Sequence, residues 1–394
     1  MARTPEQHAQ AVESLLGRRG TISLGLVDAA HAQAVTAEDV IAEHPSPRFD
    51  NSQMDGYALS IDHINGTPGQ FRVGPTVAAG TDPDQIYPDG VSAAIAPIMT
   101  GARIPRGTAA IVPVEKCVPP TFGSEGAFVE VPAVPTGQFI RRQGSDIPAG
   151  GIVVPAGTKV TAPVVATLAA QSIAEVEVMR PGRIVIVTGG AEIGAPGAAT
   201  IPDSNAPMLR ALAEHYGIQV VGHVSTNDDP AALRADLEQA IDEYQPDALV
   251  TSGGISAGKF EVVRQVLEPS GWFGHVAQQP GGPQGLAKLN GTPVIALPGN
   301  PVSTWVSFRL YVAPFLGTVP PSLEAVLSEE TTGIPGREQF RRAHLNYADA
   351  TVSAMPIGGA ASHLISQAVT ADCLIRIPQS TTVQAGSLVT VYPL

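Results

Sequence analysis

Residues 183–197 read RIVIVTGGAEIGAPG, an apolar run that ends in two glycines and is followed by one isolated acid, Glu192. A short run of Ile and Val that stops at glycine is typical of a buried strand. Two other stretches have the same form: VTSGGISAGKFE at 250–261 and IALPGNPVST at 295–304. Each follows a predicted strand and leads toward a predicted helix, which is the pattern of a doubly wound parallel α/β domain.

The segments between these stretches alternate in the same way. Strands are predicted at 217–224, 247–252 and 292–297, and helices at 205–217, 229–244, 260–271 and 301–316. The helix at 229–244 has Pro230 in its first turn and apolar residues at helical spacing, which are Leu233, Leu237, Ala240, Ile241 and Tyr244. Strand and helix in alternation imply right-handed crossovers between parallel strands.

The flanking regions have a different pattern. Between Ser23 and Arg180, short β-like runs are separated by Pro and Gly, with one good helical stretch at 162–172. From about Pro320 onward, runs such as 388–394 (LVTVYPL) predict a compact β-barrel-like domain. An opening helix is predicted from Pro5 to Arg18. The fold class is therefore multidomain α/β, with a doubly wound domain, β-rich modules and a C-terminal β-barrel-like domain.

Composition excludes several classes of protein. The 394 residues include 36 acidic and 23 basic side chains, a net charge of −13, which argues against broad nucleic-acid binding. Two distant cysteines, Cys117 and Cys373, predict neither a disulfide framework nor a thiolate zinc site. The sequence has no signal-peptide core and no long apolar stretch, so we expect a cytoplasmic protein without direct membrane insertion.

The glycine-rich stretches are candidates for an anion or nucleotide site. Glycine lets the backbone approach a ligand, and helix N-termini direct N–H groups at negative charge. Asn300 and Pro301 have the residue types of a helix N-cap and first turn. None of the stretches matches the P-loop or GxGxxG spacing, so a P-loop kinase and a Rossmann dehydrogenase are disfavoured. The alternative is that each glycine-rich stretch is an ordinary turn.

Acidic residues accompany these stretches. They are Glu192, Asp228, Asp229 and Glu261 in the α/β region, and Asp55 and Asp146 in the β-rich part. Carboxylates beside a phosphate site are the surroundings in which Mg²⁺ is held, because that ion binds a few carboxylates together with phosphate oxygens. The alternative for any single acid is structural: Asp228 or Asp229 would cap the helix that begins at Pro230, and Glu192 would be solvated.

Five motifs in order resemble one family. They are PRFDNSQMDGYAL (47–59), IMTGARIPRGTAAIVPVE (98–115), RRQGSDI (141–147), TSGGISAGKFE (251–261) and LPGNPVST (297–304). Together they resemble the MoeA family of molybdopterin molybdenumtransferases, which includes the E domain of gephyrin. The resemblance extends over nearly the whole chain.

The resemblance implies an activity and an architecture. Family members insert molybdate into adenylated molybdopterin, release AMP and require Mg²⁺. They are homodimers of four subdomains, and subdomain II closes the cleft of the partner chain. The expected ranges are 21–45 with 140–176 for the linker subdomain I, 46–139 for the β-rich subdomain II, 1–20 with 177–318 for the α/β subdomain III, and 319–394 for the barrel subdomain IV.

The resemblance also implies site residues. The expected catalytic residues are Asp55, Asp146, Glu192, Asp228, Glu261 and Lys288, of which Glu192, Asp228 and Glu261 would hold the metal. The expected substrate-binding residues are Thr100, Ser252, Gly253, Gly254, Gly299, Asn300, Ser303, Arg342 and Ser362.

Three departures from the family pattern support an alternative function. The family's TGDEL reads TGGAEI here, its aspartate after the GGVSxG motif is Glu261, and its lysine-rich positions hold His275, Gln279 and Gly282. Lys288 remains as the main nearby cation. Loss of a lysine removes a charge-assisted bond worth about 1.5–3 kcal/mol. The alternative is a catalytically weakened relative that acts as a dimeric scaffold and holds a protein partner in a groove between subdomains.

Overall fold

The structure is a computed structural model that describes residues 2–189, 201–226, 229–255, 261–348 and 350–394. Its contacts divide the chain into two units. The larger unit comprises Met1–Val35 and Glu177–Leu394, and the smaller unit comprises Thr36–Val176. The finer division into four subdomains stays a prediction.

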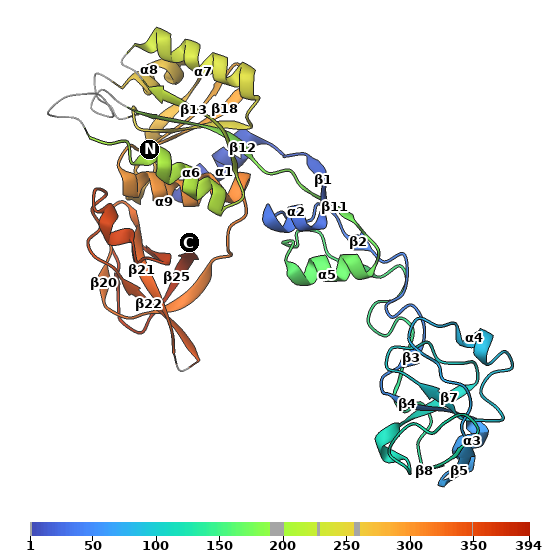
Figure 1. Ribbon diagram of the computed structural model, residues 1–394. Coiled ribbons are helices and arrows are strands. Elements are labelled where there is room, and N and C mark those ends of the chain that lie inside the picture. The colour runs from blue at the N-terminus through green and yellow to red at the C-terminus, as the bar shows by residue number, and fades with distance from the viewer. Residues whose placement is uncertain (1, 190–200, 227–228, 256–260, 349) are drawn as a thin grey trace. The chain divides into compact units, whose positions relative to one another are not determined.

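The larger unit is built around a sheet that is six-stranded in its described part (Figure 1). Its order is β13 (Gln219–Thr226), β12 (Arg183–Gly189), β14 (Ala248–Ser252), β18 (Thr292–Leu297), β17 (Pro283–Leu289) and β15 (Gly271–His275). The first four strands are parallel, which confirms the doubly wound domain. The strands β17 and β15 add an antiparallel edge that the sequence did not predict. Glycines interrupt the apolar pattern of β15 and β17, because aromatic rings fill the space that a side chain would need. A Cβ on Gly285, for example, would lie 2.3 Å from the Phe273 ring.

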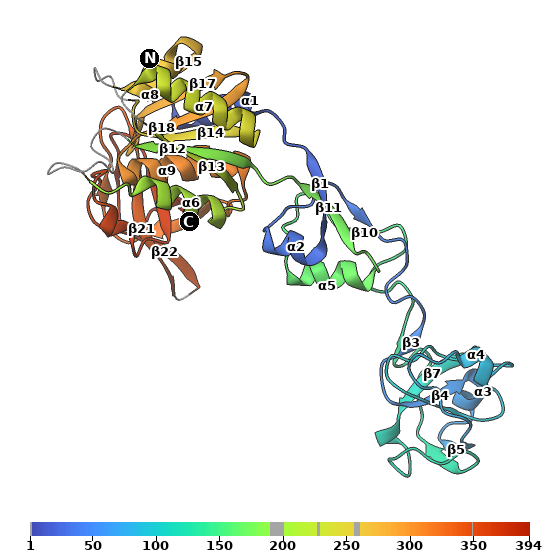
Figure 2. The same ribbon diagram turned by 45° about the horizontal axis from the view of Figure 1, so that its top comes forward.

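Helices cover both faces of this sheet (Figure 2). One face carries α1 (Pro5–Leu16), α6 (Asn205–His215), α9 (Pro301–Tyr311) and α10 (Ala313–Leu316), and the other carries α7 (Pro230–Tyr244) and α8 (Val262–Leu267). Ile184 and Ile186 pack into the first face, whereas Val185 and Val187 pack into the second. Burial on both faces explains why the strand reads as a continuous apolar run.

The helix predicted at 301–316 is divided into α9 and α10 at Val312. Pro314 lies in the first turn of α10 and has no N–H to donate, so the hydrogen-bond ladder is interrupted before it. The predicted helix at 260–271 is also shorter, since α8 ends at Leu267 and a 3-10 turn, Glu268–Ser270, follows.

The C-terminal region forms a closed barrel, as expected. Its strands are β21 (Glu338–Ala348), β22 (Thr351–Pro356), β19 (Leu323–Leu327), β25 (Leu388–Pro393) and β23 (Cys373–Ile377), and β23 pairs back onto β21. Apolar side chains such as Leu327, Ile375 and Val391 fill its interior. The short strand β16 (Gln278–Gln279) pairs with β21, and β20 (Thr331–Thr332) pairs with β24 (Thr382–Val383).

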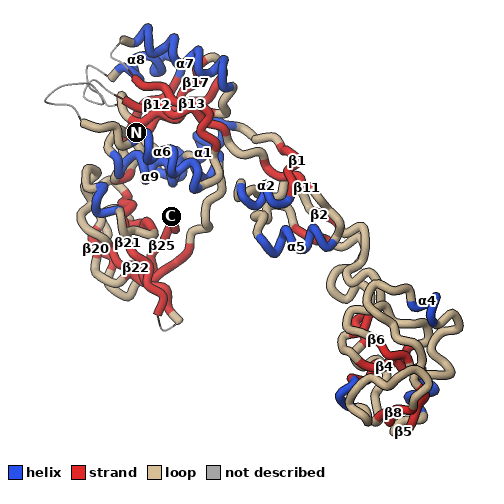
Figure 3. The backbone as a smooth tube through the Cα atoms, viewed as in Figure 1, coloured by secondary structure: helices blue, strands red, loops and turns tan. Residues whose placement is uncertain are grey.

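The smaller unit is rich in short strands, as predicted (Figure 3). Its central sheet is β6 (Ala96–Ile98), β4 (Gly56–Ser60) and β7 (Thr108–Pro113). The strand pairs are β2 (Val40–Ile41) with β10 (Ile152–Val154), β3 (Asn51–Ser52) with β9 (Ile140–Arg141), and β5 (Gly69–Arg72) with β8 (Phe128–Val131). A Cβ on Gly56 would lie 2.0 Å from the Val112 carbonyl oxygen, so only glycine allows β4 and β7 to pair there.

The remaining elements are short. They are α2 (Leu26–His31), α3 (Ile61–Asn65), α4 (Pro83–Ile86), α5 (Ala162–Ala170), β1 (Thr21–Gly25) and β11 (Glu175–Met179). Cys117 and Cys373 are both buried free thiols. Within the described ranges, the helices are too short or too polar to cross a membrane.

His8 of α1 lies in the core of the larger unit. Its side chain is 0% exposed, and its ring packs edge-on against Tyr311 at 4.7 Å and tilted against Trp272 at 5.5 Å. Among the described residues, neither ring nitrogen has a hydrogen-bond partner. Burial, together with the positive charge of Arg3, lowers the pKa of His8 from 6.5 to about 3. The imidazole is therefore neutral in the folded protein.

This lowered pKa predicts acid sensitivity of the larger unit. Above pH 6.5, His8 is neutral in both the folded and the unfolded protein. Below pH 6.5, His8 is protonated in the unfolded protein but stays neutral in the folded protein. At pH 5 this difference removes roughly 2 kcal/mol of stability. Between pH 7 and pH 5, the free energy of unfolding of His8→Phe should therefore fall by about 2 kcal/mol less than that of the wild type. Urea unfolding followed by tryptophan fluorescence measures it, because Trp272 contacts His8.

The exposed His31 provides the matched control. His31→Phe should lose as much stability as the wild type over the same pH interval. If His8→Phe and the wild type lose equal stability on acidification, the burial of a neutral imidazole is not the cause.

Candidate functional site

A cavity of about 700 Å³ lies at the carboxyl ends of the parallel strands in the larger unit. Gly189 of β12, Thr226 of β13, Ser252 of β14 and Pro298 after β18 all line it. This is the edge at which ligands bind in open α/β sheets. The prediction that the glycine-rich stretches meet at one edge is confirmed for Gly189, Gly254 and Gly299, while Gly190 lies outside the described residues.

The two glycine-rich stretches after β14 and β18 are in direct contact. A Cβ on Gly299 would lie 3.1 Å from the Gly253 Cα, which is tighter than ordinary van der Waals contact. Gly253 also has φ +94° and Gly254 has φ +69°, backbone conformations that side chains disfavour. The N–H of Gly253 donates to the Leu297 carbonyl at 3.1 Å. Both stretches therefore form one continuous backbone wall of the cavity.

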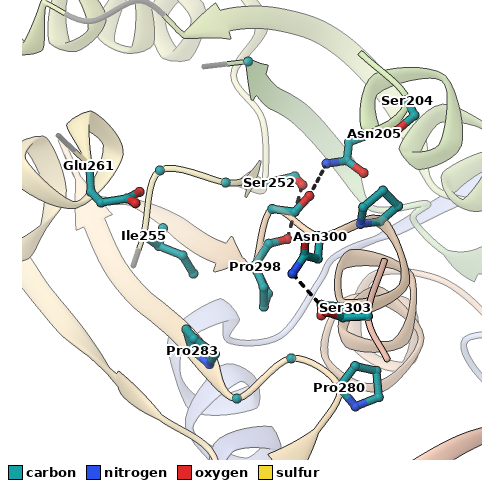
Figure 4. Close-up of a pocket in the computed structure, with 18 of the residues that line it drawn as sticks. Ser204, Asn205, Ser252, Ile255, Glu261, Pro280, Pro283, Pro298, Asn300 and Ser303 are labelled. Carbon is teal, nitrogen blue, oxygen red and sulfur yellow. Dashed lines mark hydrogen bonds between the residues drawn. The ribbon is translucent and has the colours of Figure 1, made fainter. Parts of the chain in front are cut away.

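The start of α9 faces this cavity (Figure 4). Buried hydrogen bonds of Thr304 hold it in place. Thr304 Oγ1 donates to the Pro298 carbonyl at 2.6 Å and lies 2.9 Å from Ser252 Oγ. Asn300 is the N-cap residue and Pro301 occupies the first turn, as predicted. The Asn300 side chain makes no cap hydrogen bond, however; its Nδ2 donates to Ser362 Oγ at 2.9 Å. The N-terminus of α9 thus presents its positive dipole end to the cavity.

The segment that leads into α6, with the first residue of that helix, contributes residues that the sequence did not indicate. Asp203 accepts from the backbone N–H groups of Asn205 and Ala206, at 2.9 and 3.0 Å, and from Thr188 Oγ1 at 2.6 Å. Asn205, only 5% exposed, donates through Nδ2 to the Gly299 carbonyl at 2.8 Å. Asp203, Ser204 and Asn205 line the cavity. Their signal in the sequence was the Asp-Ser-Asn run at the start of the predicted helix, which is a capping pattern.

Neutral amide side chains hold the wall at residues 278–283. Gln278 Nε2 donates to the Pro280 carbonyl at 2.9 Å, and Tyr311 OH donates to Gln278 Oε1. Gln284 Nε2 donates to the Gly281 carbonyl at 2.8 Å, and Gln339 Nε2 donates to Gln279 Oε1 at 2.6 Å. Gln279 and Gly282, which the resemblance places at two lysine positions of the family, line the cavity, whereas His275 does not. This wall is therefore uncharged.

One cation lines the cavity among the residues that the structure describes. It is Arg337, an exposed residue of the barrel, which the sequence analysis did not select. The described acids that line the cavity are Asp203 and Glu261. Among the described residues of the larger unit, two predicted site residues are not part of the lining: Lys288 is exposed on β17, and Arg342 is buried in β21. Ser252, Gly253, Gly254, Gly299, Asn300, Ser303 and Ser362 line it.

The predicted metal ligands are described only in part. Glu261 lines the cavity at the start of α8, on the side opposite Ser303 in Figure 4. Glu192 and Asp228 lie outside the described residues. Within the described ranges, no cluster of three His, Cys, Asp or Glu side chains could hold a metal by itself. Asp229 caps α7 by accepting from the Ala231 N–H at 2.9 Å, which agrees with the structural interpretation of that acid.

Three predicted residues belong to the smaller unit. Thr100 donates to Asp55 Oδ1 through both its N–H, at 2.6 Å, and its hydroxyl, at 2.7 Å. Both hydrogen bonds lower the pKa of Asp55, and the one from the Thr100 backbone N–H has the larger effect. Asp55 is therefore a carboxylate near neutral pH. Asp146 accepts from Ser46 Oγ at 3.3 Å. A smaller hollow of about 360 Å³ in this unit is lined by Arg48, Arg141 and Gln171, among other residues.

Family models match nearly the whole chain. The MoeA N-terminal region (domains I and II) matches residues 3–172, the probable molybdopterin binding domain matches 184–318, and the MoeA C-terminal region (domain IV) matches 324–394. Among solved structures, a crystal structure of the molybdopterin biosynthesis MoeA protein from Pyrococcus horikosii has a TM-score of 0.79 and 25% identity, and covers 100% of this chain and 99% of its own. A second, from Pyrococcus horikoshii OT3, has a TM-score of 0.82 at 22% identity with 100% of each chain covered, and supports the fold alone.

Sequence relatives agree with these matches. Molybdopterin molybdenumtransferase 2 of Mycobacterium tuberculosis is 35% identical over 417 residues and covers 100% of both chains. Molybdopterin molybdenumtransferase of Haemophilus influenzae is 31% identical over 407 residues and covers 98% of this chain and 97% of the relative. The chain therefore belongs to the MoeA family of molybdopterin molybdenumtransferases, which act in molybdenum cofactor biosynthesis.

Proposed function

We propose that this chain inserts molybdate into adenylated molybdopterin and releases AMP, with the cavity of the larger unit as its substrate site. The observation that carries the proposal is the contact between the glycine-rich stretches after β14 and β18, beside the N-terminus of α9. Backbone N–H groups and a helix dipole favour phosphate, even in a protein with a net charge of −13.

The pyrophosphate of the substrate would lie against Gly254, Gly299 and the start of α9, since the Gly253 N–H already donates to the Leu297 carbonyl. When the P–O bond to AMP breaks, negative charge grows on the departing phosphate. Fixed N–H donors stabilise such charge because they need no reorganisation. The Ser252 and Thr304 hydroxyls are hydrogen-bonded to each other, and Thr304 also donates to the Pro298 carbonyl. These bonds fix the backbone N–H donors of the cavity wall in place before the substrate binds.

Mg²⁺ is proposed as the metal of this site. Glu261 fits the role of one carboxylate ligand, with Glu192 and Asp228 as the further predicted ligands. Held by one or two of these carboxylates, a magnesium ion would supply positive charge beside the phosphates of the substrate.

Molybdate is a dianion and needs a positive partner. The uncharged wall at residues 278–283 supplies none, so we propose that Arg337 takes this role in place of the family's lysines. A guanidinium on an exposed edge of the cavity can form two hydrogen bonds to an oxyanion at once.

The reaction itself is tested by reconstitution. Purified protein, adenylated molybdopterin, Mg²⁺ and molybdate should yield AMP and a cofactor that activates a molybdoenzyme apoprotein. Omission of molybdate or Mg²⁺ should reduce the yield to background. Background turnover in the full mixture, while a lysine-bearing relative is active in the same assay, would contradict the proposal and favour the alternative of a non-catalytic scaffold.

Arg337 and Lys288 allow a matched comparison of two cations. Arg337→Gln removes the cation that lines the cavity, and we expect kcat/KM for molybdate to fall about tenfold or more, the value of a charge-assisted hydrogen bond. Lys288→Gln makes the same change of charge on an exposed strand position outside the cavity lining, and should change kcat/KM less than about twofold. The reverse order of effects would refute the assignment of Arg337.

A homodimer is also proposed, in which Asp55, Thr100 and Asp146 of one copy complete the cavity of another. The support is the family resemblance and the exposed, ionised Asp55. Asp55→Asn and Glu261→Gln should each inactivate the protein. When the two variants are unfolded together and refolded, about a quarter of the wild-type activity should return, because half of the dimers are mixed and each mixed dimer has one intact site. No recovery in a confirmed mixed dimer would show that each chain forms its site alone.

A further inference from the structure

An ion-pair cluster joins the first helix to the barrel. Arg376 of β23 pairs through Nη2 with Glu6 in the first turn of α1 and with Glu338 at the start of β21. The Arg376 and Glu338 side chains are 27% and 25% exposed, so salt screens this pair less than an ion pair on the open surface. We call Glu6, Arg376 and Glu338 the charge cluster. It connects three elements that are far apart in the sequence.

The segment that leads into the wall at residues 278–283 is hydrogen-bonded on two sides. On one side, the Arg3 N–H donates to the His275 carbonyl at 3.0 Å, and the Ala277 N–H donates to the Arg3 carbonyl at 2.8 Å. On the other side, the Glu338 N–H donates to the Ala277 carbonyl at 2.9 Å, where β16 pairs with the start of β21. The segment is therefore held between the N-terminal residues and the barrel.

The charge cluster ties these two supports to each other. Glu6 follows Arg3 by three residues, and Glu338 is the residue whose N–H bonds to the other side of the segment. Arg376 therefore bridges the elements on both sides. Arg337, which lines the cavity, directly precedes Glu338 in the chain. The same ion pairs thus hold the backbone from which the Arg337 side chain extends.

We propose that Arg376 is a positioning residue, which with Glu6 and Glu338 holds Arg337 at the edge of the wall at residues 278–283. The proposal rests on the proposed function of the cavity, in which Arg337 supplies the positive partner of molybdate. None of the three side chains of the charge cluster is part of the described cavity lining. Their effect on the site therefore passes through the start of β21, and it matters because hydrogen bonds to an oxyanion depend closely on distance and angle.

Substitutions of Arg376 separate its charge from its shape. Arg376→Gln leaves the Glu6 and Glu338 carboxylates without their shared cation, and their repulsion should displace the start of β21. We expect kcat/KM for molybdate to fall about tenfold, because a displaced Arg337 no longer meets the oxyanion correctly. Arg376→Lys keeps a positive charge between the carboxylates and should recover kcat/KM to within about threefold of the wild type. A wild-type value in folded Arg376→Gln, or no recovery in folded Arg376→Lys, would overturn the proposal.

A double-mutant cycle tests the route of the effect. If Arg376 acts through Arg337, then Arg376→Gln should lower kcat/KM for molybdate less than about twofold further once Arg337→Gln is present. Full additivity of the two losses would overturn the proposal, because a general loss of stability would act in both backgrounds.

Glu238 provides a matched control for Glu6. Glu6→Gln breaks the ion pair with Arg376, and we expect kcat/KM for molybdate to fall about two- to threefold, since the pair of Arg376 with Glu338 remains. Glu238→Gln makes the same change in an exposed ion pair with Arg234 on α7 and should leave kcat/KM unchanged. Equal losses in the two variants would overturn the proposal.

Hydrogen exchange tests the charge cluster without any turnover, so the cluster and the proposed function can fail separately. The Glu338 N–H, which donates to the Ala277 carbonyl, should exchange at least about tenfold faster in Arg376→Gln than in the wild type, and at the wild-type rate in Glu238→Gln. An unchanged Glu338 rate in folded Arg376→Gln would overturn the role of the cluster. A faster rate in a protein without transferase activity would support that role and reject only the proposed function.

Discussion

The close approach of Gly253 and Gly299 is the constraint on which the site depends. With a Cβ on Gly299 only 3.1 Å from the Gly253 Cα, any larger residue there would separate the stretches that follow β14 and β18. The separation would disturb the Asn205 to Gly299 hydrogen bond and the Ser252–Thr304 pair, both of which join neighbouring elements across the cavity. Three parts of the chain that are distant in sequence therefore form one wall of the cavity, because Gly253 and Gly299 have no side chains.

The electrostatics of this surface follow from the same constraint. An acidic protein can hold a phosphorylated substrate when backbone dipoles at a fixed spacing provide the positive end. Glutamines hold the wall at residues 278–283 by neutral hydrogen bonds, which suits a site that depends on shape and N–H donors more than on side-chain charge. The described cation of the lining is contributed by the barrel, so under the proposed function the C-terminal region would take part in the chemistry as well as in the fold.

The parts that the sequence predicted are those that depend on local patterns. The run at 183–187 and the helix from Pro230 to Tyr244 are visible because burial on one or both faces imposes a regular apolar pattern. The strands β15 and β17 were missed, since their glycines accommodate the Phe273 and Trp272 rings and so break that pattern. Arg337 and Asn205 were also missed, because only tertiary contacts bring a barrel residue and a helix start to the ends of the strands. Family resemblance selected Arg342 by its position, but its burial against the Gly359 and Leu364 carbonyls depends on the packing of the barrel.

A crystal structure with AMP and molybdate bound would show whether the cavity at the strand ends is the substrate site. We expect phosphate density within hydrogen-bonding distance of the backbone around Gly253, Gly254 and Gly299, and oxyanion density beside Arg337. Density for both ligands in the smaller hollow near Arg48 and Arg141, with the strand-end cavity filled by solvent alone, would contradict it.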